Sequence, residues 1–341
     1  MSLLPFLHAV AARQDLTFER AQEAMLVILS GEASTPQIAA FLVALRMKGE
    51  TASEVRGFAT AMRERANLAH PALGSQPVID TCGTGGDGGH TFNISTVAAF
   101  VVAGCGVAVA KHGNRSLSSQ CGSADLLEEL GVRIGVSVVQ ATQALRQAGI
   151  GFYFAPLIHP AMKHAQPARA ELKMRTVFNL LGPLANPAGA EYQLVGAPSQ
   201  QAAALMAEAL AGMPHIRRAM VVHGRDGLDE ITITAETDAF LVANGVASPI
   251  VLTPENFGVP RATLDSLSGG DRATNARIAM DILGGCGGPR EDIVAVNAAA
   301  ALWICGLHRD YLSAIEAARQ SIRSGAARRR LELLRTVQLE G

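Results

Sequence analysis

The segment QPVIDTCGTGGDGGHTFNIST, residues 76–96, gives the strongest indication of how the chain folds. A short run of mostly β-branched residues at 78–81 precedes a stretch rich in glycine, and an apolar run begins at residue 97. The pattern predicts a strand, a loop and then a helix whose first residues are Ser95 and Thr96. Such junctions at the carboxyl ends of parallel strands point free N–H groups at a ligand, and glycine lets an anion approach the backbone. The segment indicates an anion-binding loop, although composition alone supports a flexible surface loop equally well.

Upstream of this segment the pattern is helical. Apolar residues recur every three or four positions in FERAQEAMLVILSG, TPQIAAFLVALRMKG and TASEVRGFATAMRERA. Thr51 and Glu54 have the spacing of a capping box, which marks the start of a helix. Downstream, short β-branched runs alternate with helical ones, which is typical of an α/β domain with a mainly parallel sheet. We therefore predict a small helical domain up to residue 72 and a larger α/β domain after it.

The α/β region is expected to begin its strands at regular intervals, with helices between them. The predicted strands are 78–81, 107–110, 152–155, 193–195 and 219–222. A β-rich insert is expected at 230–253, and the last third returns to helices, notably in NAAAALWICGL and YLSAIEAARQSIRSG. The apolar run at 97–110 is too short to span a bilayer, so it is predicted to be buried core.

Composition narrows the class of protein. The 341 residues are 49% apolar, which is enough for one large domain or two unequal ones with real cores. The 29 Lys and Arg nearly balance the 30 Asp and Glu, so we expect neither nucleic acid nor a membrane as a partner. The five cysteines contain no C-x-x-C pair, and the apolar start lacks a basic region typical of a signal peptide. We expect a soluble, cytoplasmic protein.

A second polar segment, KHGNRSLSSQCGSAD at 111–125, also follows a strand and precedes a helix. Two such loops at neighbouring strand ends would face one cleft. The donors that this segment offers to a phosphate are Lys111, Arg115, Ser118, Ser119 and Ser123. Taken alone, Lys111 and Arg115 fit solvated surface charges better, and His112 and Asn114 fit core and turn positions as well.

A third segment, FAPLIHPAMKHAQPARAELKMRTVFNLLGPLANP, places Arg169 and Arg175 among prolines and apolar residues. An arginine in such a setting can hold a small carboxylate through two hydrogen bonds. The residues alone favour the alternative, a linker between domains whose arginines pair with surface acids.

A fourth segment, VVHGRDGLDEITI, ends a predicted strand with the adjacent carboxylates Asp229 and Glu230. Hard oxygen ligands suit Mg²⁺, which keeps several waters and shares its coordination shell with substrate phosphates. An isolated Asp-Glu pair is usually solvated charge, but beside two phosphate loops a metal site becomes a competitive interpretation.

The four segments resemble successive motifs of the anthranilate phosphoribosyltransferase family. They are GTGGDGGHTFNIST, KHGNRSLSSQCGSADLLEELG, RTVFNLLGPLANP and HGRDGLDE, and the resemblance is collinear over almost the whole chain. It implies a fold similar to the nucleoside phosphorylases, with a small helical domain (1–72, completed by about 165–190) beside an α/β domain (73–164 and 191–341). It further implies a homodimer and an active site in the cleft between the domains.

The resemblance also implies which residues form the site. Contacts to phosphoribosyl pyrophosphate (PRPP) would come from Gly83, Gly86, Asp87, Thr91, Asn93, Ile94, Ser95, Thr96, Lys111, His112, Gly113, Asn114, Arg115, Ser116, Leu117, Ser118, Ser119 and Ser123. Contacts to anthranilate would come from Gly83, Asn114 and Arg169, with His112, Pro156, His159 and Met162 lining the approach. Mg²⁺ would be held by Ser95, Asp229 and Glu230, and Lys111 would act electrostatically. No covalent nucleophile is implied.

The implied reaction is displacement of pyrophosphate from C1 of the ribose of PRPP by the amine of anthranilate, a step of tryptophan biosynthesis. Two alternatives stay open. A pyrimidine nucleoside phosphorylase would continue its lysine loop as Lys-His-Ser-Thr-Gly-Gly, where this chain has KHGNR. A non-catalytic relative that binds nucleic acid is disfavoured by the balanced charge and by the presence of Asp229 and Glu230.

One position departs from the family pattern. In ELKMRT, Lys173 stands where the family usually has glycine. If that glycine serves a positive φ or close packing between domains, lysine there costs about 1 kcal/mol. We predict altered domain closure with intact chemistry.

Overall fold

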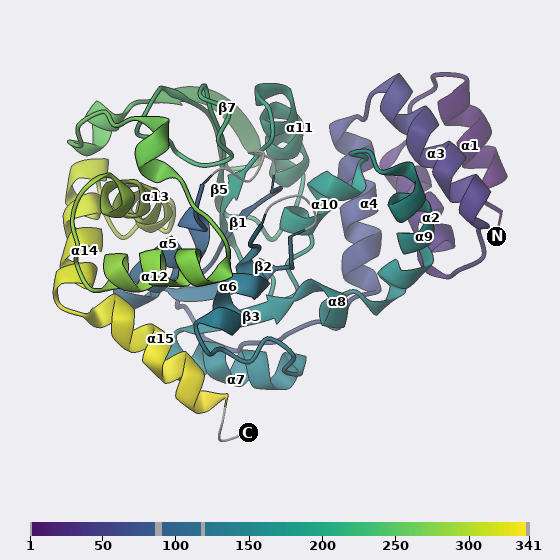
Figure 1. The fold of residues 1–341 in the computed structure, drawn as a ribbon. Coiled ribbons are helices and arrows are strands. Elements are labelled where there is room, and N and C mark those ends of the chain that lie inside the picture. The colour runs from purple at the N-terminus through teal and green to yellow at the C-terminus, as the bar shows by residue number, and fades with distance from the viewer. Residues whose placement is uncertain (1, 86–90, 117–119, 339–341) are drawn as a thin grey trace.

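The computed structural model describes residues 2–85, 91–116 and 120–338, and these form two lobes side by side (Figure 1). The larger lobe is built on a seven-stranded sheet in the order β3-β2-β1-β4-β5-β6-β7. The strands are β1 (Val78–Gly83), β2 (Ala108–Gly113), β3 (Ile150–Phe154), β4 (Tyr192–Gly196), β5 (Arg218–Gly224), β6 (Thr237–Ala243) and β7 (Val246–Leu252). Pairing is parallel from β3 to β5 and antiparallel from β5 to β7. The α/β fold class, the five predicted strands and the β-rich insert are confirmed.

Helices cover both faces of this sheet (Figure 1). The helices of the larger lobe are α5 (Ile94–Gly104), α6 (Ser123–Glu129), α7 (Val138–Ala148), α11 (Gln200–Ala211), α12 (Arg272–Leu283), α13 (Pro289–Ile304), α14 (Tyr311–Arg323) and α15 (Ala326–Val337). Ile79 and Val109 share one apolar cluster with α5 and α13, whereas Val195 and Val221 share another with α11. Because side chains alternate along a strand, the two clusters lie on opposite faces of the sheet.

The helix after the first loop is the centre of the larger core. Residues 97–103 of α5 and residues 107–110, which lead into β2, are buried as predicted, whereas 104–106 between them are partly or fully exposed. The helix begins at Ile94, one residue before the predicted start. The carbonyl of Asn93 already accepts a hydrogen bond from the Val97 N–H at 3.1 Å, so the helical ladder starts at that point.

The smaller lobe is helical and combines two separate parts of the chain. Its helices are α1 (Leu4–Ala11), α2 (Phe18–Leu29), α3 (Thr35–Lys48), α4 (Ala52–Glu64), α9 (Gln166–Leu172) and α10 (Phe178–Leu184). The predicted capping box is present, because the Thr51 N–H donates to Glu54 at 2.8 Å and the Glu54 N–H donates to Thr51 Oγ1 at 3.3 Å. Helix α9 packs on α3, and α10 packs on α4 and α11, which joins the two lobes. No helix in the described part of the chain is long and apolar enough to cross a membrane.

Candidate active site

A cleft of about 720 Å³ lies between the two lobes, at the carboxyl ends of β1 and β2. It brings together every described residue that the family resemblance assigns to PRPP: Gly83, Thr91, Asn93, Ile94, Ser95, Thr96, Lys111, His112, Gly113, Asn114, Arg115, Ser116 and Ser123. Arg169, Asp229 and Glu230 line the same cleft. Pro156, His159 and Met162 do not line it. Gly86, Asp87, Leu117, Ser118 and Ser119 lie outside the described residues.

A buried charge pair closes the floor of the cleft between β1 and β2. Lys111 is 2% exposed and donates to the carbonyl of Thr81, while Asp80 is fully buried. The Asp80 carboxylate accepts hydrogen bonds from Asn186 Nδ2 at 2.7 Å and from the His112 N–H at 3.3 Å. Burial raises the pKa of Asp80 to about 6 although Lys111 and Asn186 oppose this, and burial lowers the pKa of Lys111 although Asp80 opposes it. Each of the two residues therefore favours the charged form of the other in an apolar setting.

This arrangement corrects one interpretation of the sequence and adds residues that it missed. Lys111 is not a solvated surface charge, because its ammonium lies inside the protein. Asp80 and Asn186 were not singled out, yet the charge of Asp80 favours the charged form of Lys111, and Asn186 donates to the Asp80 carboxylate. The available signal was a lone carboxylate in the middle of an apolar strand, since a buried acid requires a partner.

The carboxylates of Asp229 and Glu230 reach the first loop from the segment between β5 and β6. Asp229 Oδ2 accepts from the Gly85 N–H at 3.0 Å, and Glu230 Oε1 accepts from the Ser95 N–H at 3.1 Å. Asp229 is 8% exposed, so the interpretation as solvated charge is wrong for it. A Cβ at Gly196 would lie 1.7 Å from the Asp229 carbonyl oxygen, which shows how closely the segment packs on the strand ends.

The same geometry tests whether this cleft suits Mg²⁺. Two carboxylates and the Ser95 hydroxyl are hard oxygen donors at one edge of the cleft. No group of three or more His, Cys, Asp or Glu that could hold a metal occurs among the residues that the structure describes. The donor set therefore fits an ion that takes the rest of its ligands from water and from a bound phosphate.

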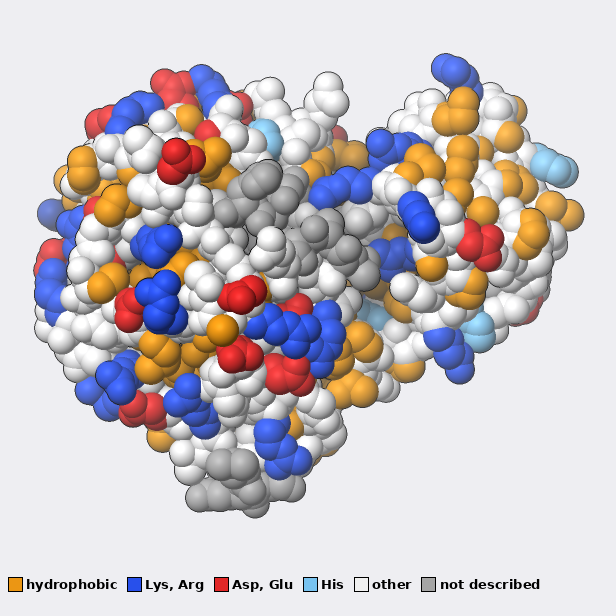
Figure 2. All heavy atoms as spheres, in the orientation of Figure 1, with side chains coloured by type: hydrophobic (Ala, Val, Ile, Leu, Met, Phe, Trp, Pro, Cys, Tyr) orange, Lys and Arg blue, Asp and Glu red, His pale blue; other side chains and the backbone are white. Residues whose placement is uncertain are grey.

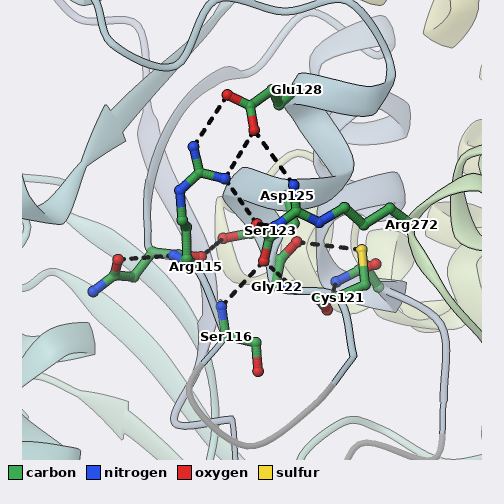
Figure 3. Close-up of polar contacts among 10 residues, drawn as sticks. Arg115, Ser116, Cys121, Gly122, Ser123, Asp125, Glu128 and Arg272 are labelled. Carbon is green, nitrogen blue, oxygen red and sulfur yellow. Dashed lines mark hydrogen bonds and ion pairs between the residues drawn. The ribbon is translucent and has the colours of Figure 1, made fainter.

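The second loop is fastened by ion pairs (Figure 3). The exposed Arg115 donates to Asp125 at 2.9 Å and to both oxygens of Glu128 at 2.8 and 3.0 Å. Arg272 of α12 lies 2.6 Å from the same Asp125. Asn93, in the first loop, is held as firmly, because its Nδ2 donates to the Cys121 carbonyl at 2.9 Å and its Oδ1 accepts from Asn275 at 3.1 Å.

The small-lobe side of the cleft carries cations of a different kind. The Arg169 guanidinium lies 5.2 Å from the ring centroid of Phe178, and no carboxylate among the described residues pairs with it. Arg175 donates to the Gly85 carbonyl at 2.8 Å, so it links the small lobe to the first loop. Figure 2 shows Lys and Arg side chains on the part of the small lobe turned to the large one. Among the residues that the structure describes, neither Arg169 nor Arg175 pairs with a surface acid, contrary to that expectation.

Lys173 ends α9 in the left-handed conformation, with φ 47° and ψ 33°. Its N–H donates to the Arg169 carbonyl at 3.3 Å, and the residue lines the cleft. A positive φ is unfavourable for lysine and open to glycine. Lys173 therefore has the positive φ at which lysine is expected to cost stability relative to glycine.

Two buried histidines lie where the cleft meets the small lobe. The rings of His112 and His159 are 5.1 Å apart between centroids. His112 Nδ1 lies 3.0 Å from the Gly182 carbonyl. Burial lowers the pKa of His112 to about 4 and that of His159 to about 3, with the charge of Lys111 adding to the first shift and His112 adding to the second. Both rings are neutral at physiological pH.

Family models match both lobes of the chain. Residues 4–66 match the helical bundle domain of a glycosyl transferase family, and residues 75–328 match the a/b domain of a glycosyl transferase family. The protein is therefore a glycosyl transferase of the two-domain type.

Individual relatives narrow this class. The anthranilate phosphoribosyltransferase of Solibacter usitatus is 55% identical over 98% of both chains. A crystal structure of the Thermus thermophilus anthranilate phosphoribosyltransferase is 41% identical and superposes with a TM-score of 0.91 over 98% of this chain and 99% of the other. The Saccharomyces cerevisiae enzyme, solved with PRPP and Mg, is 28% identical with a TM-score of 0.90 over 99% and 98% of the chains.

The chain belongs to the anthranilate phosphoribosyltransferase family. The family resemblance seen in the sequence is confirmed. The two alternatives that the sequence left open, a pyrimidine nucleoside phosphorylase and a nucleic-acid-binding protein, are not the activities for which these relatives are named.

Proposed function

We propose that the cleft between the lobes transfers the phosphoribosyl group of PRPP to the amine of anthranilate, giving N-(5-phosphoribosyl)anthranilate and pyrophosphate for tryptophan biosynthesis. The observation that carries the proposal is one cleft that joins two loops rich in phosphate donors to an arginine with no carboxylate partner among the described residues. The sugar phosphate and pyrophosphate lie against the loops after β1 and β2, and anthranilate lies toward α9.

Bond breaking at C1 of the ribose leaves negative charge on pyrophosphate and positive character on the sugar ring. Donors that are already in place stabilise such charge without reorganising during the reaction. Thr91, Ser95 and Asn114 line the cleft, and their polar side chains would bind the departing oxygens. The buried Lys111 adds a fixed positive charge beneath them. No nucleophile of the protein is needed, because the amine of anthranilate attacks C1 directly.

Asp229, Glu230 and Ser95 hold Mg²⁺ in this proposal. Mg²⁺ supplies charge neutralisation on the pyrophosphate when it is bound. In this chain the two carboxylates also tie the β5–β6 segment to the first loop through Gly85 and the Ser95 N–H. The carboxylates of Asp229 and Glu230 therefore also hold the first loop close to the edge of the cleft where the metal would bind.

Arg169 receives the carboxylate of anthranilate. Burial lowers the pKa of Arg169, but the guanidinium stays charged at physiological pH, and stacking on Phe178 restricts its orientation. A planar guanidinium holds a carboxylate through two parallel hydrogen bonds, which would turn the aromatic amine toward C1. The neutral ring of His112 lines the cleft and adds no charge there, and the neutral ring of His159 packs against it.

The protein is further proposed to be a homodimer in the cytoplasm, with residues 1–72 and about 165–190 as the small domain. Met47 of α3 is 72% exposed and Leu4 of α1 is 40% exposed, so apolar side chains of the small lobe are open to contact with a second copy. All five cysteines are free thiols, which suits a reducing compartment. Light scattering at several concentrations tests the dimer, and a purely monomeric mass would contradict it.

The decisive experiment mixes the purified protein with PRPP, Mg²⁺ and anthranilate and follows the loss of anthranilate fluorescence. The expected result is a loss that depends on all three components and a stoichiometric release of pyrophosphate. The Ser95→Ala/Asp229→Asn double variant is the matched control. A wild-type rate no higher than that of the control would refute the proposed function.

A further inference from the structure

The carboxylate of Asp125 contacts both ends of the segment that follows β2 (Figure 3). Its Oδ2 accepts hydrogen bonds from the Ser116 N–H at 3.3 Å and the Gly122 N–H at 2.9 Å. Its Oδ1 lies 2.9 Å from Arg115 Nη1 and 2.6 Å from Arg272 Nη2. Asp125 itself is 3% exposed, whereas the side chains of Arg115 and Arg272 are 41% and 48% exposed. One buried carboxylate thus joins the residues before the loop, the residues after it and a helix from the last third of the chain.

The two ends of the segment touch each other at Gly122. A Cβ on Gly122 would lie 2.3 Å from the Ser116 nitrogen and 2.9 Å from the Asn114 carbonyl oxygen, closer than any real side chain is found. The Asn114 carbonyl also accepts from Ser123 Oγ and from the Ala124 N–H, both at 3.2 Å. The chain therefore closes on itself where Asn114 and Ser123 enter the cleft.

Helix capping explains only part of this arrangement. An acid at the third position of a helix commonly reaches back to the N-cap N–H, which accounts for the contact with Gly122. It does not account for the Ser116 N–H, which precedes the helix by several residues. Pairing with the arginines does not require Asp125 either, because Glu128 pairs with Arg115 and lies 3.6 Å from Arg272.

The carboxylate is ionised in this setting. Burial alone would raise the pKa of Asp125, but the N–H of Gly122, the Arg115 guanidinium and the N–H of Ser116 together hold it below its ordinary value. An ionised acceptor binds backbone N–H groups about twice as strongly as a neutral one. Removing the charge is therefore expected to loosen both ends at once.

We infer that Asp125 is a positioning residue for the transfer reaction, which closes the second loop so that Asn114 and Ser123 face PRPP in a fixed geometry. The inference rests on the proposed function, since that function assigns Asn114 and Ser123 to PRPP. It adds a residue that does not itself line the cleft.

Asp125→Asn tests this role, with Glu128→Gln as the matched control. Glu128 pairs with the same two arginines but accepts from no backbone N–H of the described part of the loop. We expect Asp125→Asn to raise the PRPP KM about tenfold, the effect of one lost charge-assisted hydrogen bond, and to change the anthranilate KM less than about threefold. Amide hydrogen exchange at Ser116 and Gly122 is expected to accelerate in Asp125→Asn and not in Glu128→Gln.

Gly122→Ala separates the two ends of the segment by a steric clash and leaves the Asp125 carboxylate in place. It is the second test variant if Asp125→Asn does not fold. It is expected to raise the PRPP KM selectively as well. Faster amide exchange without a change in the PRPP KM would overturn the inference, and so would an equal rise in both KM values. A rise as large in Glu128→Gln would overturn it too, because the effect would then belong to charge balance around the arginines. If the wild-type protein transfers nothing, the proposed function fails, while amide exchange still reports whether Asp125 closes the loop.

Discussion

The two walls of the cleft hold their polar groups in different ways. On the α/β wall, Lys111 and Asn93 are each fixed by neighbouring groups of the protein. On the small-lobe wall, Arg169 stacks on Phe178 and has no carboxylate partner among the described residues. The first arrangement suits a flexible, multiply charged ligand, because donors that are already in place reduce the ordering that binding requires. The second leaves a cation available for a small, rigid anion.

Glu230→Gln tests the α/β wall and has the largest expected effect. We expect kcat/KM for PRPP to fall about 100-fold, the cost of removing one group that stabilises developing charge. Calorimetric titration of PRPP should require more Mg²⁺ for the same affinity, because one oxygen ligand has lost its charge. An unchanged dependence on Mg²⁺ would show that Glu230 only ties the first loop.

Arg169→Ala tests the opposite wall. We expect the anthranilate KM to rise about 10- to 100-fold, which is the range for a lost hydrogen-bonded charge pair, with a much smaller change for PRPP. Arg46→Ala is a suitable control, because Arg46 belongs to the same lobe and donates to the Arg175 carbonyl at 2.6 Å. Equal effects on both substrates would contradict the division of the cleft into two walls.

At low pH, the buried His159 should lower the stability of the folded protein. Its pKa in the folded protein, about 3, lies below the unfolded value, so the folded state binds fewer protons. The stabilisation is complete above the unfolded pKa and is lost as the pH falls toward the folded one, by about 1.4 kcal/mol per pH unit. Chemical unfolding between about pH 6.5 and pH 4 should show a shallower slope for His159→Phe. An unchanged slope in His159→Phe would contradict this role of His159.

Lys173→Gly should have the smallest effect. Relief of the left-handed lysine is expected to raise the free energy of unfolding by up to about 1 kcal/mol, measured by urea unfolding. If domain closure changes as well, the KM values for both substrates shift together. Lys173→Asn removes the charge while tolerating a positive φ, so it separates strain from charge. Unchanged KM values in Lys173→Gly would contradict the prediction that Lys173 alters domain closure.

The sequence predicted the pattern of the fold well because that pattern is local. The capping box at Thr51 and the strand-loop-helix order around residues 76–96 depend on neighbours in the chain, and both were confirmed. Burial was predicted less well. Taken alone, the charges of Lys111 and Asp229 favour exposure to solvent, although both residues are buried. Their partners Asp80 and Gly85 are remote in the chain, the second by 144 positions, so the local pattern does not show which group meets which charge.

The order of residues was enough to establish the two-domain class, the loops that carry phosphate donors and the family of the protein, because each is encoded in contiguous motifs. The folded chain was needed to show which of those residues share a cleft and which charges are compensated inside it. The buried pair of Lys111 and Asp80 forms because two parallel strands align their carboxyl ends. The closure by Asp125 forms because a helix turns its first carboxylate back on the loop that precedes it. Both depend on distances between segments, which the order of residues does not contain.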